Sequence, residues 1–110
     1  MKNMIGKTVT VTVDRPLGSC HPKHPDIYYP INYGYIGGII AADGEEQDAY
    51  ILGVNGPVKE LTGIVIAIIH RLNDEEDKWI IAPKGMHFSR EQIQKLTHFQ
   101  EQYFDTVIII

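Results

Sequence analysis

The sequence consists of short strand patterns separated by turn residues, with a single helical pattern near its end. Residues 8–13 (TVTVTV) alternate β-branched residues strictly, which predicts a strand with valines on one face and threonines on the other. Further strands are predicted over residues 31–42, 48–54, 62–72, 78–82 and 107–110. The third of these is apolar on both faces, as is typical of a central strand.

The helical pattern begins after Ser89. Ser89 and Gln92 have the spacing of a capping box, which indicates the first turn of a helix. Residues at helical spacing follow, namely Ile93, Leu96, Phe99, Gln100 and Tyr103. Five or six short strands with one late helix predict a small barrel, or a strongly coiled sheet, with the helix packed against it. Residues 1–110 are predicted to form one domain, because this length supports one core and shows no repeat or linker.

Composition excludes several classes of protein. The net charge is −4, so the chain lacks the basic character of a nucleic-acid-binding protein, and no apolar run is long enough to span a membrane. Cys20 is the only cysteine and cannot form an internal disulfide. The first residues lack the apolar segment of a secretory signal, so we expect a cytoplasmic protein.

The acidic residues gather in two predicted turns, 43–48 (DGEEQD) and 74–77 (DEED), which hold eight of the fourteen carboxylates. In the first turn Asp43, Glu45 and Asp48 stand at a hairpin, where polar loop meets apolar strand. Oxygen ligands gathered in this way suit a hard cation such as Mg²⁺. The alternative is a pair of solvated turns with ordinary surface acids. If the turns face each other, a cation between them would relieve the repulsion of their charges.

The long loop 15–30 carries a third group of reactive side chains, Cys20-His21-Pro22-Lys23-His24. These residues could bind zinc, although no second cysteine or histidine pair completes a ligand set. They could instead be solvated, or donate hydrogen bonds to a phosphate as cations.

Two segments together resemble the soluble family I inorganic pyrophosphatases. Residues 29–36 (YPINYGYI) are similar to that family's Tyr-Pro-x-Asn-Tyr-Gly-Tyr-Ile segment, and residues 43–48 follow where the family has Asp-x-Asp-Pro-x-Asp. Weaker similarity covers the segments 14–19, 76–78 and 98–103. The chain thus resembles a shortened and divergent member of the family.

The resemblance implies a mainly β fold, an OB-like five-stranded barrel with one C-terminal helix packed against it. It also implies Mg²⁺-dependent hydrolysis of pyrophosphate, or of a related phosphoanhydride, at the acidic mouth of this barrel, which could also accept Mn²⁺. It implies that Glu45 and Asp48 are catalytic. The implied metal ligands are Asp14, Asp43, Asp48, Glu76 and Asp77, and the implied phosphate contacts are Lys23, Tyr33, Lys78 and Tyr103. Clustered metal ions would lower the pKa of bound water and neutralise the leaving phosphate.

Several positions depart from the family pattern. Glu45 and Glu46 stand where the family has Asp and Pro, and Pro22 and Phe104 stand where it has lysines. The hairpin that carries a substrate arginine is missing between residues 19 and 29, which leaves Arg15 or Arg71 to replace that charge. An alternative function is therefore a non-catalytic barrel that binds a phosphorylated small molecule. The apolar residues 107–110 are a predicted edge strand, which makes a homo-oligomer plausible.

Overall fold

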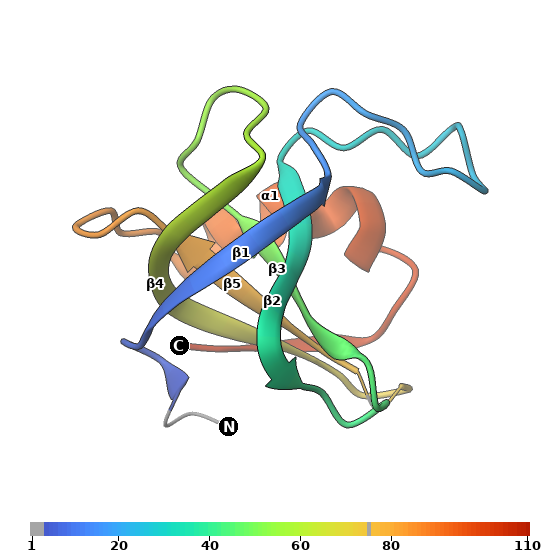
Figure 1. The fold of residues 1–110 in the computed structure, drawn as a ribbon. Helices are drawn as coiled ribbons and strands as arrows, with labels where there is room; N and C mark the ends of the chain where they lie inside the picture. The colour runs from blue at the N-terminus through green and yellow to red at the C-terminus, as the bar shows by residue number, and fades with distance from the viewer. Residues whose placement is uncertain (1–3, 75) are drawn as a thin grey trace.

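The computed structural model describes residues 4–74 and 76–110, and Glu75 of the second acidic turn lies outside this part. The described chain forms six strands and one helix (Figure 1). In chain order they are β1 (Thr8–Arg15), β2 (Asn32–Ile40), β3 (Glu46–Ile51), β4 (Glu60–Arg71), β5 (Asp77–Ala82), α1 (Arg90–Glu101) and β6 (Thr106–Ile109).

Five of the strands close into a barrel in the order β1-β2-β3-β5-β4, and β4 pairs with β1 to complete it. Neighbouring strands are antiparallel except for β3 and β5, which run parallel. The short strand β6 pairs with β4 outside the closed barrel. The predicted OB-like barrel with one helix is confirmed, and the last strand lies at the sheet edge as expected.

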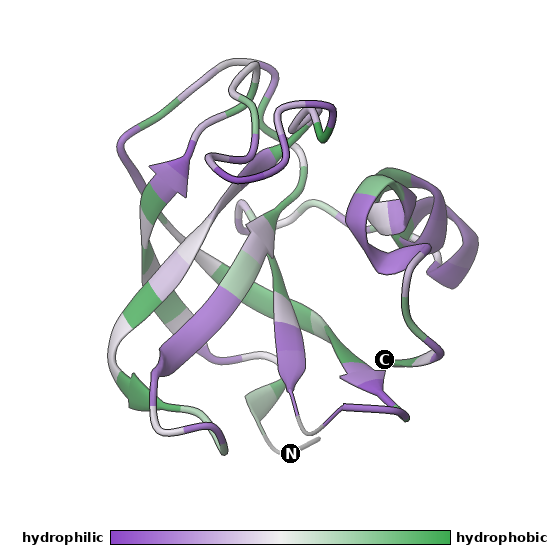
Figure 2. Ribbon diagram, turned by 90° about the vertical axis from the view of Figure 1, so that its right-hand side faces the viewer, coloured by the Kyte–Doolittle hydropathy of each residue, from purple (hydrophilic) through white to green (hydrophobic). Residues whose placement is uncertain are grey.

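The helix forms a second layer on one side of the barrel (Figure 2). One cluster of buried side chains fills the barrel, with Val11, Ile68 and Trp79 among its members. A second cluster, which includes Tyr50 and Ile69, lies between the barrel wall and Ile93 of α1. Strand β4 contributes to both clusters, which explains why its sequence is apolar on both faces.

Two glycines meet local demands of the fold. Gly34 of β2 pairs with Val13 of β1, and a β-carbon at Gly34 would lie 1.9 Å from the carbonyl oxygen of Thr12. Only glycine allows the strands to approach so closely there. Gly44 has a φ of +85° in the predicted turn between β2 and β3, a conformation that glycine adopts without strain.

Helix α1 begins as predicted. Ser89 is the N-cap, and reciprocal hydrogen bonds with Gln92 form the capping box. Its buried residues are Ile93, Thr97 and Glu101. The helix ends at Glu101, so the prediction that Tyr103 belongs to it is wrong by two residues.

The loop between β1 and β2 folds back on itself as a short arm (blue to cyan in Figure 1). The backbones of Cys20 and Tyr28 form an isolated antiparallel β-bridge, and the backbone N–H of Tyr29 donates to the carbonyl oxygen of Ser19 at 2.9 Å. Within the described residues, the predicted long loop therefore contains one isolated bridge but no strand of its own. This arm contains no arginine between residues 19 and 29.

Among the described residues, no helix has the length and apolar character needed to cross a membrane.

Candidate active site

The first acidic turn, between β2 and β3, meets the turn between β4 and β5 (Figure 1). A cavity of about 300 Å³ lies between them, here called the acidic cavity. Its lining residues are Tyr35, Asp43, Glu45, Glu46, Asp48 and Glu76. The two turns therefore face each other as the sequence predicts.

Asp43 and Glu76 hold the two turns together by a hydrogen bond between their carboxyl groups. Burial raises the pKa of Glu76, and the hydrogen bond to Asp43 raises it further. The pKa of Asp43 is lowered by its hydrogen bonds with the backbone N–H of Glu45 and with Glu76. The opposite shifts of these two pKa values show that the two carboxyl groups interact across the cavity.

A second cavity, of about 340 Å³, has the opposite character and is here called the cationic cavity. Its lining residues are Arg15, His21, His24, Ile27, Tyr33, Arg71, Lys78, Gln100, Tyr103 and Phe104. They come from four strands, the β1–β2 loop and the end of α1. This described lining includes no carboxylate, so the cavity is suited to an anion.

Ion pairs form the boundary between the two cavities. Lys78 Nζ lies 2.6 Å from Asp48 Oδ2 and 3.4 Å from Glu76 Oε2. Arg71 Nη1 lies 3.1 Å from the same oxygen of Glu76. Two cations of one cavity thus neutralise two carboxylates of the other, and a site for anions adjoins a site for cations.

Tyr33 lies at this boundary. Lys78 Nζ donates to its phenol oxygen at 3.0 Å, and Tyr33 is itself hydrogen-bonded to Asp48. Burial and the nearby Asp48 charge raise the pKa of Tyr33 well above its ordinary value. Its hydroxyl therefore stays protonated and remains a hydrogen-bond donor.

Arg71 is fixed from behind by α1. Its Nη2 lies 2.7 Å and its Nε 3.0 Å from Glu101, and both side chains are nearly excluded from solvent, 4% and 6% exposed. Tyr50 donates to Glu101 at 2.6 Å, and Phe104 stacks on the guanidinium at 3.6 Å. Burial is the largest single influence on the pKa of Arg71 and lowers it, but the hydrogen bonds to Glu101 and the negative charges of Glu101 and Glu76 together outweigh burial and raise this pKa.

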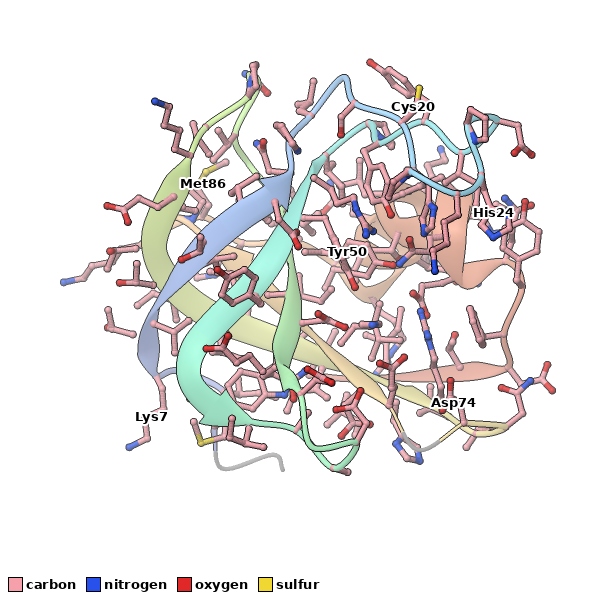
Figure 3. The ribbon with its side chains drawn as sticks, turned by 45° about the vertical axis from the view of Figure 1, so that its right-hand side comes forward. Lys7, Cys20, His24, Tyr50, Asp74 and Met86 are labelled. Carbon is pink, nitrogen blue, oxygen red and sulfur yellow. The ribbon has the colours of Figure 1, made fainter. Side chains whose placement is uncertain are left out.

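A neutral network supports the other side of the cationic cavity. Arg15 donates to the hydroxyl of Tyr29 at 3.2 Å, and that hydroxyl donates to Gln100 at 2.8 Å. Gln100 in turn donates to Tyr50 at 2.7 Å. Tyr50 lies between the barrel strands and α1 (Figure 3). Because Tyr50 and Arg71 both contact Glu101, Arg15 and Arg71 stand at the two ends of one series of hydrogen bonds.

Three of the predicted site residues lie outside both cavity linings. Asp77 is turned away from Glu76 by the alternation of side chains along the strand, and its Oδ1 lies 2.7 Å from His70 Nδ1. Lys23 is exposed on the β1–β2 loop, although its neighbours His21 and His24 line the cationic cavity. Asp14 is exposed near the end of β1, and the partial loss of its hydration raises its pKa.

The other predicted residues lie in one cavity or the other. Asp43, Glu45, Asp48 and Glu76 line the acidic cavity. Tyr33, Lys78 and Tyr103 line the cationic one, with Tyr103 exposed at its edge.

The described carboxylates fit a hard divalent cation by chemistry and number. Five carboxylates surround one cavity, where a cation would relieve the repulsion between their charges. In residues 4–74 and 76–110, no three His, Cys, Asp or Glu side chains converge closely enough to hold a metal ion. Binding a cation would therefore require these side chains to turn inward.

The fold is that of solved inorganic pyrophosphatases. The enzyme from Ehrlichia chaffeensis matches with a TM-score of 0.71 and 19% identity over 93% of this chain and 84% of that chain. Those from Thermus thermophilus and Neisseria gonorrhoeae each match with a TM-score of 0.65 and 17% identity over 94% of this chain, and over 80% and 76% of theirs. At these identities the likeness establishes the fold alone.

No protein-family model matches the sequence. A search of curated protein sequences finds no significant match either.

Sequence reasoning missed two residues, Tyr50 and Glu101, that line neither cavity but hold Arg71 in position. Glu101 accepts hydrogen bonds from Arg71, which is 30 residues away in the chain, and from Tyr50, which is 51 residues away. A buried-looking Glu on the packed face of the helix was the available signal, because such a residue needs a cationic partner. The sequence does not indicate that this partner is Arg71, because the packing of α1 against β4 brings the two residues together.

Proposed function

We propose that this protein is a Mg²⁺-dependent hydrolase of inorganic pyrophosphate or a closely related phosphoanhydride. The observation that carries the proposal is the adjoining pair of cavities, acidic and cationic, joined by Lys78–Asp48 and Arg71–Glu76. A phosphoanhydride bound with divalent cations offers charges of both signs, and the adjoining cavities are complementary to them. The fold shared with pyrophosphatases supports the same reaction class.

In the proposed reaction the cationic cavity binds the phosphate groups. Lys78 and Arg15 donate hydrogen bonds to phosphate oxygens, Tyr33 donates its retained proton, and Arg71 contributes positive charge from a fixed position. Water attacks one phosphorus, and the bond from that phosphorus to the bridging oxygen breaks. Glu45, exposed on the rim of the acidic cavity, accepts the proton that the water loses.

Asp43, Asp48 and Glu76 would hold the divalent cation, with Mn²⁺ as a substitute for Mg²⁺. When bound, the cation supplies Lewis-acid activation of water and neutralises phosphate charge. Glu76 must lose its proton to serve as a ligand, and Asp48 must share its charge with Lys78.

A phosphate-release assay tests this function. The wild-type protein, freed of metal and then supplied with Mg²⁺ or Mn²⁺, should convert pyrophosphate to phosphate, and Asp48→Asn should reduce turnover at least about a hundredfold. Glu60→Gln, an exposed substitution away from both cavities, is the matched control and should keep full activity. The proposal fails if neither metal supports turnover, or if Asp48→Asn is as active as the control.

A second candidate function is a non-catalytic module that binds a phosphorylated small molecule. It is favoured by the ion pairs themselves, because Lys78 and Arg71 already neutralise Asp48 and Glu76 in the described arrangement. Calorimetry with pyrophosphate, nucleotides and sugar phosphates separates the two functions. Tight binding without hydrolysis in the presence of either metal would support the second.

A further inference from the structure

Arg15 lines the cationic cavity without a carboxylate to hold it. Arg71 and Lys78 each form ion pairs, whereas no ion pair among the described residues involves Arg15. Its guanidinium instead donates from Nη1 to the Tyr29 hydroxyl at 3.2 Å, and its Cζ lies 5.9 Å from the centre of the Tyr29 ring. The position of Arg15 in the cavity therefore depends on a neutral side chain.

The ring of Tyr29 is held firmly. It is fully buried, and its centroid lies 5.2 Å from that of Phe99 in an edge-to-face contact and 5.7 Å from that of Tyr33. This packing fixes the ring but leaves the hydroxyl proton free to rotate. Whether the Tyr29 oxygen accepts from Arg15 therefore depends on which group takes the Tyr29 proton.

The direction of donation is set at Glu101. Arg71 donates to the two carboxylate oxygens of Glu101 at 3.0 and 2.7 Å, and a carboxylate in such a pair can only accept further hydrogen bonds. Tyr50 therefore donates its proton to Glu101, at 2.6 Å. The Tyr50 oxygen is left to accept.

Gln100 carries this direction on to Tyr29. Its Nε2 donates to the Tyr50 oxygen at 2.7 Å, which turns its Oε1 toward Tyr29. The opposite orientation of the amide would place two oxygens against each other with no proton between them. The Tyr29 hydroxyl donates to Gln100 Oε1 at 2.8 Å, so its oxygen is left to accept from Arg15.

We propose that Gln100 is a positioning residue that acts through Tyr29 to hold Arg15 in place for binding an oxyanion in the cationic cavity. The inference rests on the proposed function, in which Arg15 donates to phosphate, and deepens it. A guanidinium has several N–H donors, so the bond from Nη1 to Tyr29 leaves others for the ligand. One carboxylate, Glu101, thereby sets both arginines of the cavity, Arg71 directly and Arg15 through Gln100.

Sulfate binding without metal tests the inference. Dissociation constants are measured at one pH by NMR titration of the full chain in a chelator. Tyr29→Phe removes only a hydroxyl, and Gln100→Met keeps the length of the side chain but loses both hydrogen bonds. Each should weaken sulfate binding about fivefold, as expected for one lost hydrogen bond. Gln94→Met makes the same change at an exposed position of α1 outside the cavity lining, and this control should bind as wild type does.

A background without Arg15 separates positioning from direct contact. In Arg15→Met, the added change Gln100→Met should cause no further loss of affinity, because the residue through which Gln100 acts is gone. Tyr29→Phe combined with Gln100→Met should likewise bind sulfate as well as either single variant. A direct ligand, or a residue that only supports the fold, would weaken binding in every background.

NMR relaxation of the arginine Nε–H groups gives a second readout. In Gln100→Met the Arg15 side chain should become more mobile, because Tyr29 is no longer obliged to accept from it. Arg71 should stay ordered in the same variant, because its Nε still donates to Glu101.

The inference is overturned if wild type binds no sulfate, or if Gln100→Met binds it as tightly as wild type. It is also overturned if the loss persists in the Arg15→Met background, or if Arg15 is equally mobile in wild type and Gln100→Met. No metal and no hydrolysis are involved in these measurements. A protein that binds sulfate as expected but releases no phosphate from pyrophosphate would refute the proposed function and leave the role of Gln100 standing.

Discussion

At the scale of single residues, the site depends on charges held at contact distance by neighbours of opposite sign. Lys78 is buried, and its Nζ lies in contact with Asp48, Glu76 and Tyr33. Burying an ammonium group without such partners would be costly. The same carboxylates that stabilise Lys78 are the candidate metal ligands, so metal binding and the ion pairs are coupled.

Shortening Glu45 tests its proposed role as the proton acceptor. Glu45→Asp restores the residue found at this position in the pyrophosphatases that the sequence resembles, and it moves the carboxylate by about an ångström. A displacement of that size can change a rate by up to about a hundredfold, so we expect turnover to rise at least about tenfold. Steady-state phosphate release measures it, with Glu60→Asp as the control, and unchanged or lower turnover would argue against this role.

Protons and metal ions should compete at Glu76. Its folded-state pKa lies above the ordinary value of 4.5, so the folded protein keeps a proton there that the unfolded chain has lost. Without metal, this group's contribution to stability is greatest below the ordinary pKa and is lost as pH rises through the folded pKa. Mg²⁺ has the opposite preference, because it binds the deprotonated carboxylate.

The stabilisation by Mg²⁺ should therefore grow with pH across that window. Thermal unfolding with and without Mg²⁺, measured at pH values from below to above the folded pKa, gives the shift in Tm. In Glu76→Gln the shift should be smaller and less dependent on pH. A wild-type shift that stays constant or falls with rising pH would exclude Glu76 as a ligand.

At the scale of elements, α1 is fastened to the barrel by a buried ion pair as well as by apolar packing. Ile93 packs on the barrel wall, while Glu101 at the last turn reaches Arg71 of β4 and Tyr50 of β3. The helix thereby sets the position of Arg71 in the cationic cavity. Loss of this contact would affect both stability and the site.

Removing one partner of this pair should be costly. Glu101→Gln or Arg71→Met leaves a charge buried without its counterpart, and we expect each to lower the free energy of unfolding by about 3–5 kcal/mol. The double variant Arg71→Met/Glu101→Leu should recover most of that loss, because no buried charge remains. Urea unfolding measures the effect, with the exposed Glu91→Gln as control, and additive losses in the double variant would contradict it.

At the scale of the whole molecule, closure of the barrel brings the two cavities together. Strands β3 and β5 are neighbours although β4 lies between them in sequence, and this pairing places Asp48 beside Lys78. The outer strand β6 forms the edge that the sequence predicts. Assembly of the chain into a homo-oligomer through that edge stays a prediction.

Closure should depend on the absence of a side chain at Gly34. In Gly34→Ala the new methyl group would meet the Thr12 carbonyl, so β1 and β2 would have to separate. We expect a loss of more than about 3 kcal/mol in the free energy of unfolding. Gly56→Ala is the matched control, because a β-carbon there meets open space, and equal stability of the two variants would refute the steric argument.

The sequence by itself determined the local elements and the acidic turns. Strict alternation in 8–13, the Asp43-Gly44 turn and the Ser89–Gln92 capping box depend on neighbouring residues only, and each appears where predicted. The closed barrel with an acidic mouth was implied by the resemblance to a known family, whereas the order of its strands was not predicted. The roles of Asp43, Asp48 and Glu76 as ligands stay predictions.

Only the tertiary structure decided which side chains share a cavity. Asp77 and Lys23 stand next to residues that line the site, yet strand alternation and the fold of the arm turn them elsewhere. Arg71 and Glu101 show no pattern in the sequence, because their attraction exists only once β4 and α1 are packed together and water is excluded. Local patterns fix the strands and turns, but distant charges become partners only when the barrel closes.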